Sequence, residues 1–369
     1  MIQDQIRTIL TDCDTFTDLL FASESLPMKR SPRGWQTAGC DLQPSTHEAI
    51  SAFIEELEPN WQALITKGEI NRPYHIDGWR LRINAYLAFA GSKVMLCVRR
   101  IREHVPDFKD LRLPPSLPML LNHSSGLILV SGATGSGKTT SVAAMVEYIN
   151  GTRPAHVVSI EDPIEYIWKP KRCVFSQREV GVDCDTFTDG VAAALRQKPD
   201  VIVIGEIRDR ATAEQALQAG ESGHLVLATM HASSAVGTVS KLLSFFPDNE
   251  RTARVSSLAS CLLGIINQTL IPNKDGLRSV LAIEAIANAK RDYSRLLLEP
   301  EKMQSRMESH EDALSIGLAT SVLKLIDEGA VERPDAVKAT MANAAAFERI
   351  SEKLASAQGE GRFAGGARR

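Results

Sequence analysis

Short apolar runs recur through the middle of the chain, and stretches with helical spacing separate them. A continuous apolar run of this length is typical of a strand buried on both faces of a parallel sheet. Strands that alternate with helices predict a parallel α/β core. The predicted strands are 127–130, 157–160, 201–204 and 225–229, and the predicted helices are 139–148, 187–197 and 211–221.

The first part of the chain has a different pattern. Apolar side chains recur at helical spacing over residues 46–66. Two further stretches, 79–85 and 94–99, alternate partly in the manner of strands. We therefore predict a small α+β domain over residues 1–103.

Prolines and glycines indicate the domain boundaries. Four prolines fall within residues 104–118, and because neither a helix nor a central strand tolerates such a density, we predict an interdomain linker there. The α/β domain then spans 119–354, with a mostly helical pattern after about residue 244. Residues 355–369 are rich in glycine and alanine, so we expect a disordered tail.

The composition of the 369 residues is that of an ordinary soluble globular protein, with 44% apolar and 24% charged residues. A net charge of −3 gives no general attraction to nucleic acid. The six cysteines include no CxxC pair, which argues against a zinc or redox motif and favours a reducing cytosol. The N-terminus has no signal-peptide pattern, and no apolar run approaches the ~20 residues of a membrane span. At a membrane, we expect the protein to act only as a peripheral partner.

One glycine-rich segment fits the phosphate-binding pattern G-x-x-x-x-G-K-[ST] and lies between a predicted buried strand and a predicted helix. Glycines let backbone N–H groups turn toward a phosphate, and the helix N-terminus adds partial positive charge. We expect Lys138 to reach the β- and γ-phosphates and the Thr139 hydroxyl to ligate Mg²⁺. The predicted binding set is Gly132, Ala133, Thr134, Gly135, Ser136, Gly137, Lys138, Thr139 and Thr140.

A carboxylate follows the predicted strand 201–204. This is Glu206, and the pattern is that of a Walker B segment. A carboxylate there holds the Mg²⁺ shell through water or orients the attacking water. Arg208 fits a surface ion pair with Asp209 or Glu206 as well as it fits a phosphate role.

Three further carboxylates, Glu161, Asp162 and Glu165, follow the strand 157–160. Carboxylates this close repel one another, and Mg²⁺ or a polarised water offsets that cost. A solvated turn between strand and loop is the alternative explanation. The residues alone leave both open.

Two histidines, His224 and His231, bracket the strand 225–229. Their odd separation places them on opposite faces of a regular strand, so they are not expected to form a joint metal pair. We expect one to read the nucleotide and the other to pack or bond locally.

Arginines cluster on the two strands predicted in the first domain. They form either a solvated face or a set of arginine fingers for nucleotide at a subunit boundary. They are Arg80, Arg82, Arg99, Arg100 and Arg102.

The order of these motifs carries a family resemblance. The P-loop, IEDPIEY (160–166), VIVIGEIRD (201–209) and GHLVLATMH (223–231) resemble the Walker A, Asp box, Walker B and His box of secretion-superfamily hexameric ATPases. Within these, the chain is most similar to the PilT-type type IV pilus retraction ATPases. The resemblance covers roughly residues 75–330 and includes 82–86, 176–180, 194–196 and 268–270.

The resemblance implies a PAS-like N-terminal domain, a RecA-like ATPase domain and a homohexameric ring with ATP between the two domains. By position, Glu165 would be the general base and Glu206 the Walker B acid. His224 and His231 would be the His-box residues, and Arg82 and Arg99 the arginines near phosphate. The implied function is a cytoplasmic, Mg²⁺-dependent ATPase, peripheral at the inner membrane, that moves a type IV pilus through an inner-membrane platform protein.

The chain departs from the family at residues 289–297, where the retraction ATPases carry an AIRNLIRE element that is rewritten here. A changed partner-facing segment beside intact ATPase boxes leaves a conjugation or type IV/type II secretion apparatus as the alternative. A RecA- or helicase-type nucleic-acid motor is disfavoured because no basic stripe with interleaved aromatics is present, and no direct nucleic-acid partner is expected. A GTPase is rejected because Asn273-Lys274-Asp275-Gly276 has the wrong spacing. A nucleotide-dependent scaffold would leave Glu165 and Glu206 without a role.

Overall fold

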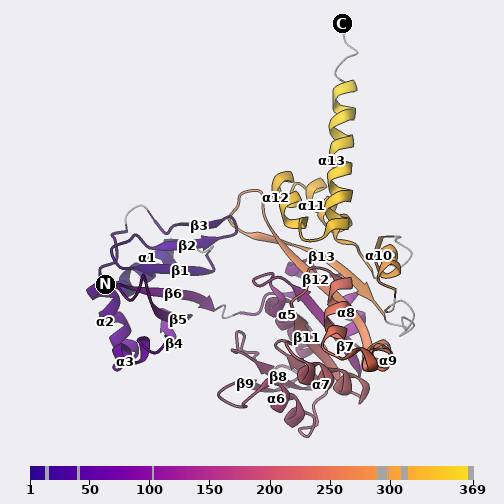
Figure 1. Ribbon diagram of the computed structural model, residues 1–369, viewed down its shortest axis with the longest axis horizontal. Helices are drawn as coiled ribbons and strands as arrows, with labels where there is room; N and C mark the ends of the chain where they lie inside the picture. Colours follow the sequence, from indigo (N-terminus) through magenta and orange to yellow (C-terminus); the bar gives the residue numbers. More distant parts are fainter. Residues whose placement is uncertain are drawn as a thin grey trace. The chain divides into compact units, whose positions relative to one another are not determined.

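The structure is a computed structural model (Figure 1). It describes residues 1–12, 16–39, 42–101, 104–288, 297, 299–308 and 315–364. The chain divides into two compact units. The first comprises Met1–His104 and Asp275–Ser279, and the second comprises Val105–Lys274 and Val280–Arg369.

The first unit is built on an antiparallel sheet with the strand order β3-β2-β1-β6-β5-β4. Three helices bury their apolar side chains against this sheet. The stretch 46–66 forms two helices rather than one, because Glu58 precedes Pro59 and adopts an extended conformation that ends the first. The elements are α1 (Ile2–Asp12), β1 (Asp18–Ala22), β2 (Met28–Ser31), β3 (Gly34–Thr37), α2 (His47–Leu57), α3 (Trp61–Ile65), β4 (Glu69–Ile76), β5 (Trp79–Ala88) and β6 (Lys93–Ile101).

In the described residues, the second unit contains a seven-stranded sheet with the order β13-β12-β7-β11-β10-β8-β9. The strands from β12 to β9 pair in parallel. This confirms the predicted parallel α/β core. The strands are β7 (Gly126–Gly132), β8 (His156–Glu161), β9 (Val174–Glu179), β10 (Val201–Ile204), β11 (Leu225–Met230), β12 (Leu262–Pro272) and β13 (Ser279–Ala287).

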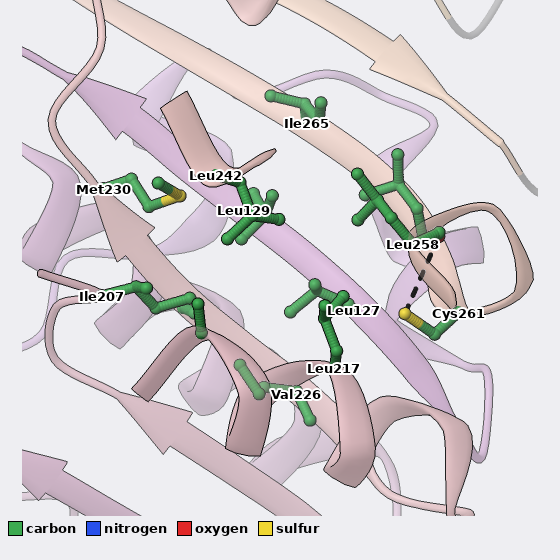
Figure 2. Close-up of a cluster of buried hydrophobic side chains, with 14 of the residues drawn as sticks. Leu127, Leu129, Ile207, Leu217, Val226, Met230, Leu242, Leu258, Cys261 and Ile265 are labelled. Carbon is green, nitrogen blue, oxygen red and sulfur yellow. Dashed lines mark hydrogen bonds between the residues drawn. The ribbon is translucent and has the colours of Figure 1, made fainter. Parts of the chain in front are cut away.

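Helices cover both faces of this sheet, and alternate residues of one strand enter different cores. Leu127 and Leu129 pack with Leu217 and Leu242 (Figure 2), whereas Ile128 packs in the other core with residues of α5. Burial on both faces explains why the strands are apolar without alternation. The helices are η1 (Phe108–Leu111), α4 (Leu117–Leu121), α5 (Lys138–Thr152), α6 (Phe187–Ala194), α7 (Arg210–Glu221), α8 (Ala235–Ser244), η2 (Asp248–Glu250), α9 (Arg251–Cys261), α10 (Pro300–Glu308), α11 (Leu318–Asp327), α12 (Arg333–Thr340) and α13 (Ala344–Ala364).

The prediction of a mostly helical chain after residue 244 is wrong for β12 and β13. The apolar run 262–266 cannot be assigned to helix or strand by periodicity alone. The backbone at Gly264 is closely packed, since an added Cβ would be 2.9 Å from Leu120 Cδ1 and 3.1 Å from Ile286 O. Close packing on both sides therefore favours the strand.

The proline-rich segment 104–118 is not a free linker. From Val105 onward it belongs to the second unit. Leu113 and Leu117 are buried in its core, and the Phe108 ring lies 5.5 Å from that of Tyr148. The prolines exclude a long helix or strand, but the apolar residues between them still pack.

The chain is also helical beyond the boundary at residue 355. Helix α13 continues to Ala364, and the residues after it lie outside the described part. Residues 355–364 include alanine, glutamine, glutamate and arginine, which favour helix, beside two of the glycines on which the tail prediction rested. The rewritten element 289–297 lies outside the described residues except for Leu297.

Candidate active site

Four of the motifs meet at one edge of the seven-stranded sheet. The P-loop follows β7, the acidic box follows β8, Glu206 follows β10, and His231 follows β11. These strands lie side by side in the order β7-β11-β10-β8 and run in parallel, so their carboxyl ends share an edge (Figure 1). Ligands of open α/β sheets bind at this edge.

The P-loop requires glycine at positions where the backbone is left-handed or crowded. Gly132 has a φ of 146°, and a Cβ there would be 2.5 Å from both Gln268 O and Ser136 Oγ. Gly135, with a φ of 77°, faces open space. Helix α5 follows from Gly137, and among the described residues no side chain caps its start. The N–H groups of its first turn can therefore bind an anion.

Lys138 lies across this loop. Its ammonium donates to the carbonyl oxygens of Gly132 (3.0 Å) and Ala133 (2.9 Å). The residue is only 8% exposed. Burial lowers the pKa of the Lys138 ammonium, and the nearby Glu206 and Glu165 carboxylates oppose this. A buried ammonium held by neutral carbonyls binds an anion strongly when one is offered.

The loop fits a phosphate chain. Ser136 Oγ is buried and has no hydrogen-bond partner among the described residues. The Ser136 hydroxyl and the N–H groups at the start of α5 are hydrogen-bond donors, and they surround the open space beside Gly135. Thr139, half-buried beside Lys138, carries the hydroxyl that would ligate Mg²⁺. Within the described ranges, no group of three or more His, Cys, Asp or Glu side chains is arranged to hold a metal ion by itself.

His231 connects Lys138 with Glu206. Its Nδ1 lies 3.4 Å from Lys138 Nζ, and its Nε2 lies 3.2 Å from Glu206 Oε1. These contacts assign the acceptor role to Nδ1 and the proton to Nε2. The other carboxylate oxygen of Glu206 accepts a hydrogen bond from Arg208 Nε at 2.8 Å. Both oxygens of the Glu206 carboxylate are therefore oriented.

His224 lies at the opposite end of β11. Its Nδ1 is 3.2 Å from Ala219 O and 3.2 Å from Ser222 Oγ. Within this chain the structure brings His231 into the site and leaves His224 outside it. The two histidines lie apart because they bracket β11 at its two ends, and the sequence argument from alternation could not say which of them lies beside the other motifs.

The three carboxylates of the acidic box have three different environments. Glu161 is 6% exposed and accepts hydrogen bonds from Ser159 Oγ (2.7 Å) and Gln177 Nε2 (3.3 Å). Burial raises the pKa of the Glu161 carboxyl to about 7, and the neighbouring Glu165 adds to this. Asp162 is exposed, 3.5 Å from Arg208. Glu165 is half-buried and close enough to act on both Lys138 and Glu161.

Arg208 bonds to Glu206 and Asp162, so the ion-pair alternative applies to it. Asp209 is not its partner. Instead, the Asp209 carboxylate accepts the backbone N–H of Thr212 at 2.8 Å and caps α7.

Arg82 and Arg99 belong to the first unit. They lie directly opposite each other on β5 and β6, and so on the same face of that sheet. Arg99 donates to Asp18 Oδ1 at 2.8 Å, and the Arg100 guanidinium lies 3.9 Å from the Trp79 ring centre. Arg102 lies outside the described residues. The role of Arg82 and Arg99 near phosphate stays a prediction.

Sequence reasoning gave no role to several polar residues that support the site. Asn267 donates to Ser131 Oγ and to Ala232 O, both at 3.0 Å. These bonds join the strand before the P-loop to the loop after His231. Gln268 similarly donates to Ser141 on α5. The sequence indicates these two residues only by placing two side-chain amides, Asn267 and Gln268, directly after the apolar run 262–266.

Comparison with known proteins gives one family. Residues 78–306 match the family described as "Type II/IV secretion system protein". The protein YggR of Escherichia coli K12 is 41% identical over 235 residues, 62% of this chain and 72% of that protein. Type IV pilus retractation ATPase PilT of Pseudomonas aeruginosa is 33% identical over 302 residues, 80% of this chain and 86% of that protein. A crystal structure of the pilus retraction motor PilT with bound ADP has a TM-score of 0.77 and 32% identity, and the match covers 92% of this chain and 97% of that chain.

Proposed function

The chain belongs to the Type II/IV secretion system protein family and is an ATPase of the secretion superfamily, and we propose that it is the motor of a type IV pilus. One observation carries the proposal: Lys138, His231 and Glu206 form a contiguous chain at the sheet edge where Glu165 also lies. The name and function of the similar PilT protein support the pilus as the load.

The P-loop residues 132–140 would hold the phosphates of ATP. The hydroxyl of Thr139 would ligate Mg²⁺, and Glu206 would hold its shell through water. When bound, Mg²⁺ neutralises charge on the phosphate oxygens. His231 keeps Glu206 oriented through its 3.2 Å contact. Its Nδ1 also lies beside the Lys138 ammonium, which bonds to the carbonyl oxygens of the P-loop as well.

Glu165 is the best candidate for the general base. Glu161 is almost fully buried behind Ser159 and Gln177, and Glu206 stands in the place of the Walker B acid, in contact with His231 and Arg208. Glu165 is only half-buried, and its carboxylate lies close enough to Lys138 to raise the pKa of that ammonium. In this role its carboxylate takes the proton of the attacking water.

We further propose a homohexameric ring in which Arg82 and Arg99 neutralise phosphate charge at a domain or subunit boundary. Light scattering should give a hexamer. A strictly monomeric species that is fully active at high dilution would exclude the ring, and unchanged turnover in both Arg82→Ala and Arg99→Ala would exclude the arginine role alone.

The proposed location is the cytoplasmic side of the inner membrane, in contact with a platform protein. Among the described residues, no helix combines the length and apolar character that a membrane crossing requires. Because the segment 289–297 differs from that of the retraction ATPases, we expect a changed platform partner.

The test is twitching motility in a host that lacks its retraction motor and expresses this chain at a matched level. We expect weak restoration that exceeds a Lys138→Ala control. No restoration above this control, with ATP turnover intact, would favour the conjugation or secretion alternative. Full restoration would show that the altered segment is tolerated and that a plain retraction ATPase is the better description.

A further inference from the structure

The residue after Glu165 contacts the first turn of the P-loop helix. Tyr166 is 4% exposed, and its hydroxyl lies 3.0 Å from Thr140 Oγ1. Thr140 directly follows Thr139 in α5. This contact joins the segment that carries Glu165 to the first turn of the helix that carries Lys138 and Thr139.

The backbone around Glu165 is also held from the other side, by β9. Gln177 Nε2 donates to Tyr166 O (2.8 Å), and the Trp168 N–H donates to Gln177 Oε1 (3.3 Å). Before Glu165, the Ile164 N–H donates to Glu179 Oε2 (3.1 Å). The base segment is thus fixed between β9 and α5, with bonds both before and after Glu165.

The Trp168 and Tyr166 side chains both reach α5, and Tyr166 does so nearer the phosphate-binding turn. The Trp168 indole N–H donates to Ala143 O (3.2 Å), one turn further along the helix. Tyr166 reaches Thr140, at the helix start. Its ring lies in the apolar core with Val142 and Val146, so a phenylalanine ring would fit the same space.

We propose that Tyr166 is a positioning residue for hydrolysis, which through Thr140 fixes the separation between the Glu165 segment and the P-loop. This rests on the proposed function, in which Glu165 is the base. Tyr166 does not act on the reacting atoms; it limits how far the Glu165 segment can shift. A misplacement of about 1 Å in an active site costs up to about 10²-fold in rate.

The test compares Tyr166→Phe with Tyr148→Phe. Tyr148 is also on α5, and within the part of the chain that the structure describes its hydroxyl makes no hydrogen bond. In Tyr166→Phe we expect kcat to fall about tenfold while the affinity for ATP stays within about twofold of the parent. Tyr148→Phe should match the parent in both.

A second measurement needs no nucleotide. Hydrogen–deuterium exchange at the amides of Ile164 and Trp168 should be faster in Tyr166→Phe, because their bonds to Glu179 and Gln177 lose support from α5. Exchange in β10 should be unchanged and serves as the reference for the folded core. Loss of protection in β10 as well would show that the hydroxyl supports the whole fold and would overturn the proposal. Parental kcat in Tyr166→Phe, or an equal loss of ATP affinity, would overturn it too.

The double variant Tyr166→Phe/Glu165→Gln separates this inference from the proposed function. If Tyr166 acts through Glu165, the double variant should be no slower than Glu165→Gln. An additional tenfold fall would mean that Tyr166 acts elsewhere. If Glu165→Gln alone turns over at the parental rate, the base assignment fails, and the positioning role fails with it. If only Tyr166→Phe is at the parental rate, the base assignment stands and the inference does not.

Discussion

Polar side chains have different roles at the two ends of the strands in the seven-stranded sheet. We call the side where the parallel strands begin the amino edge and the side where they end the carboxyl edge. At the amino edge, Asp200 accepts the backbone N–H of His156 at 2.7 Å, and His224 contacts the carbonyl oxygen of Ala219 at 3.2 Å. These side chains complete backbone hydrogen bonding where strands begin. At the carboxyl edge, Lys138 also donates to backbone carbonyls, but His231 joins it to Glu206 in a chain of side-chain contacts.

The polar side chains of the amino edge contribute to the stability of the fold, whereas those of the carboxyl edge are arranged for function. Side chains that satisfy backbone groups stabilise the fold. Partly buried charges that face each other lose hydration, and their mutual attraction does not reliably restore it. A buried lysine whose pKa burial lowers, beside carboxylates as Lys138 is, is typical of active sites. The carboxyl edge should therefore respond to substitution in binding and turnover, and the amino edge only weakly.

The largest expected effect is that of Lys138→Ala. The variant loses the cation of the P-loop, so we expect ATP affinity to fall by about 10²-fold or more, since hydrogen bonds to charged groups contribute about 1.5–3 kcal/mol each. Turnover should be lost at ordinary ATP concentrations. Equilibrium binding of a fluorescent ATP analogue measures this. Lys171→Ala, which removes an exposed lysine paired with Glu147, is the control. If Lys138→Ala binds ATP as tightly as the parent, the carboxyl edge is not the nucleotide-binding side of the sheet.

Glu165→Gln should lower kcat with little effect on ATP binding. Losing a positioned general base costs on the order of 10²-fold or more in kcat. Steady-state turnover together with binding separates the two quantities. If the parental rate persists, the base is another carboxylate of the same edge, and Glu206 is the next candidate. Asp200→Asn, at the amino edge, should keep kcat within about twofold.

The sequence predicted much of the carboxyl edge and little of what holds it in place. The P-loop, Glu206 and the parallel strands follow from local patterns, since apolar strands and glycine-rich turns are short-range signals. The contact of Tyr166 with Thr140 joins residues 26 apart along the chain, and no local pattern encodes it. The same is true of β12, whose apolar run became a strand because of its neighbours in the sheet.

The pH dependence of stability measures how much an ionised Glu161 carboxylate destabilises the folded protein at the carboxyl edge. Its pKa of about 7 in the folded protein lies above the ordinary 4.5. The folded state therefore binds this proton more tightly, and the free energy of unfolding falls as pH rises from about 4.5 to about 7. The loss is on the order of 3 kcal/mol. Glu161→Gln should remove this part of the pH dependence.

Denaturant unfolding from about pH 5 to about pH 8 measures the effect. Glu250→Gln is the control, because hydrogen bonds from Arg254 and Arg210 lower the pKa of Glu250 and its titration falls below this range. If the parent and Glu161→Gln show the same slope, the Glu161 carboxyl is not held protonated by burial.

The smallest expected effect is also the most direct comparison of the two edges, because it uses the two histidines that flank one strand, β11. His231→Ala removes the contact between Lys138 and Glu206, and we expect kcat to fall about tenfold, the cost of one hydrogen bond to a charged group. His224→Ala removes contacts to Ala219 and Ser222 alone, so its kcat should stay within about twofold of the parent. The resemblance to the hexameric ATPases implies a role for both histidines, whereas the single chain brings only His231 to the other motifs. Turnover measured at the same protein concentration for both variants decides between these views. Equal losses would mean that the amino edge of β11 takes part in catalysis, through contacts that one chain does not contain.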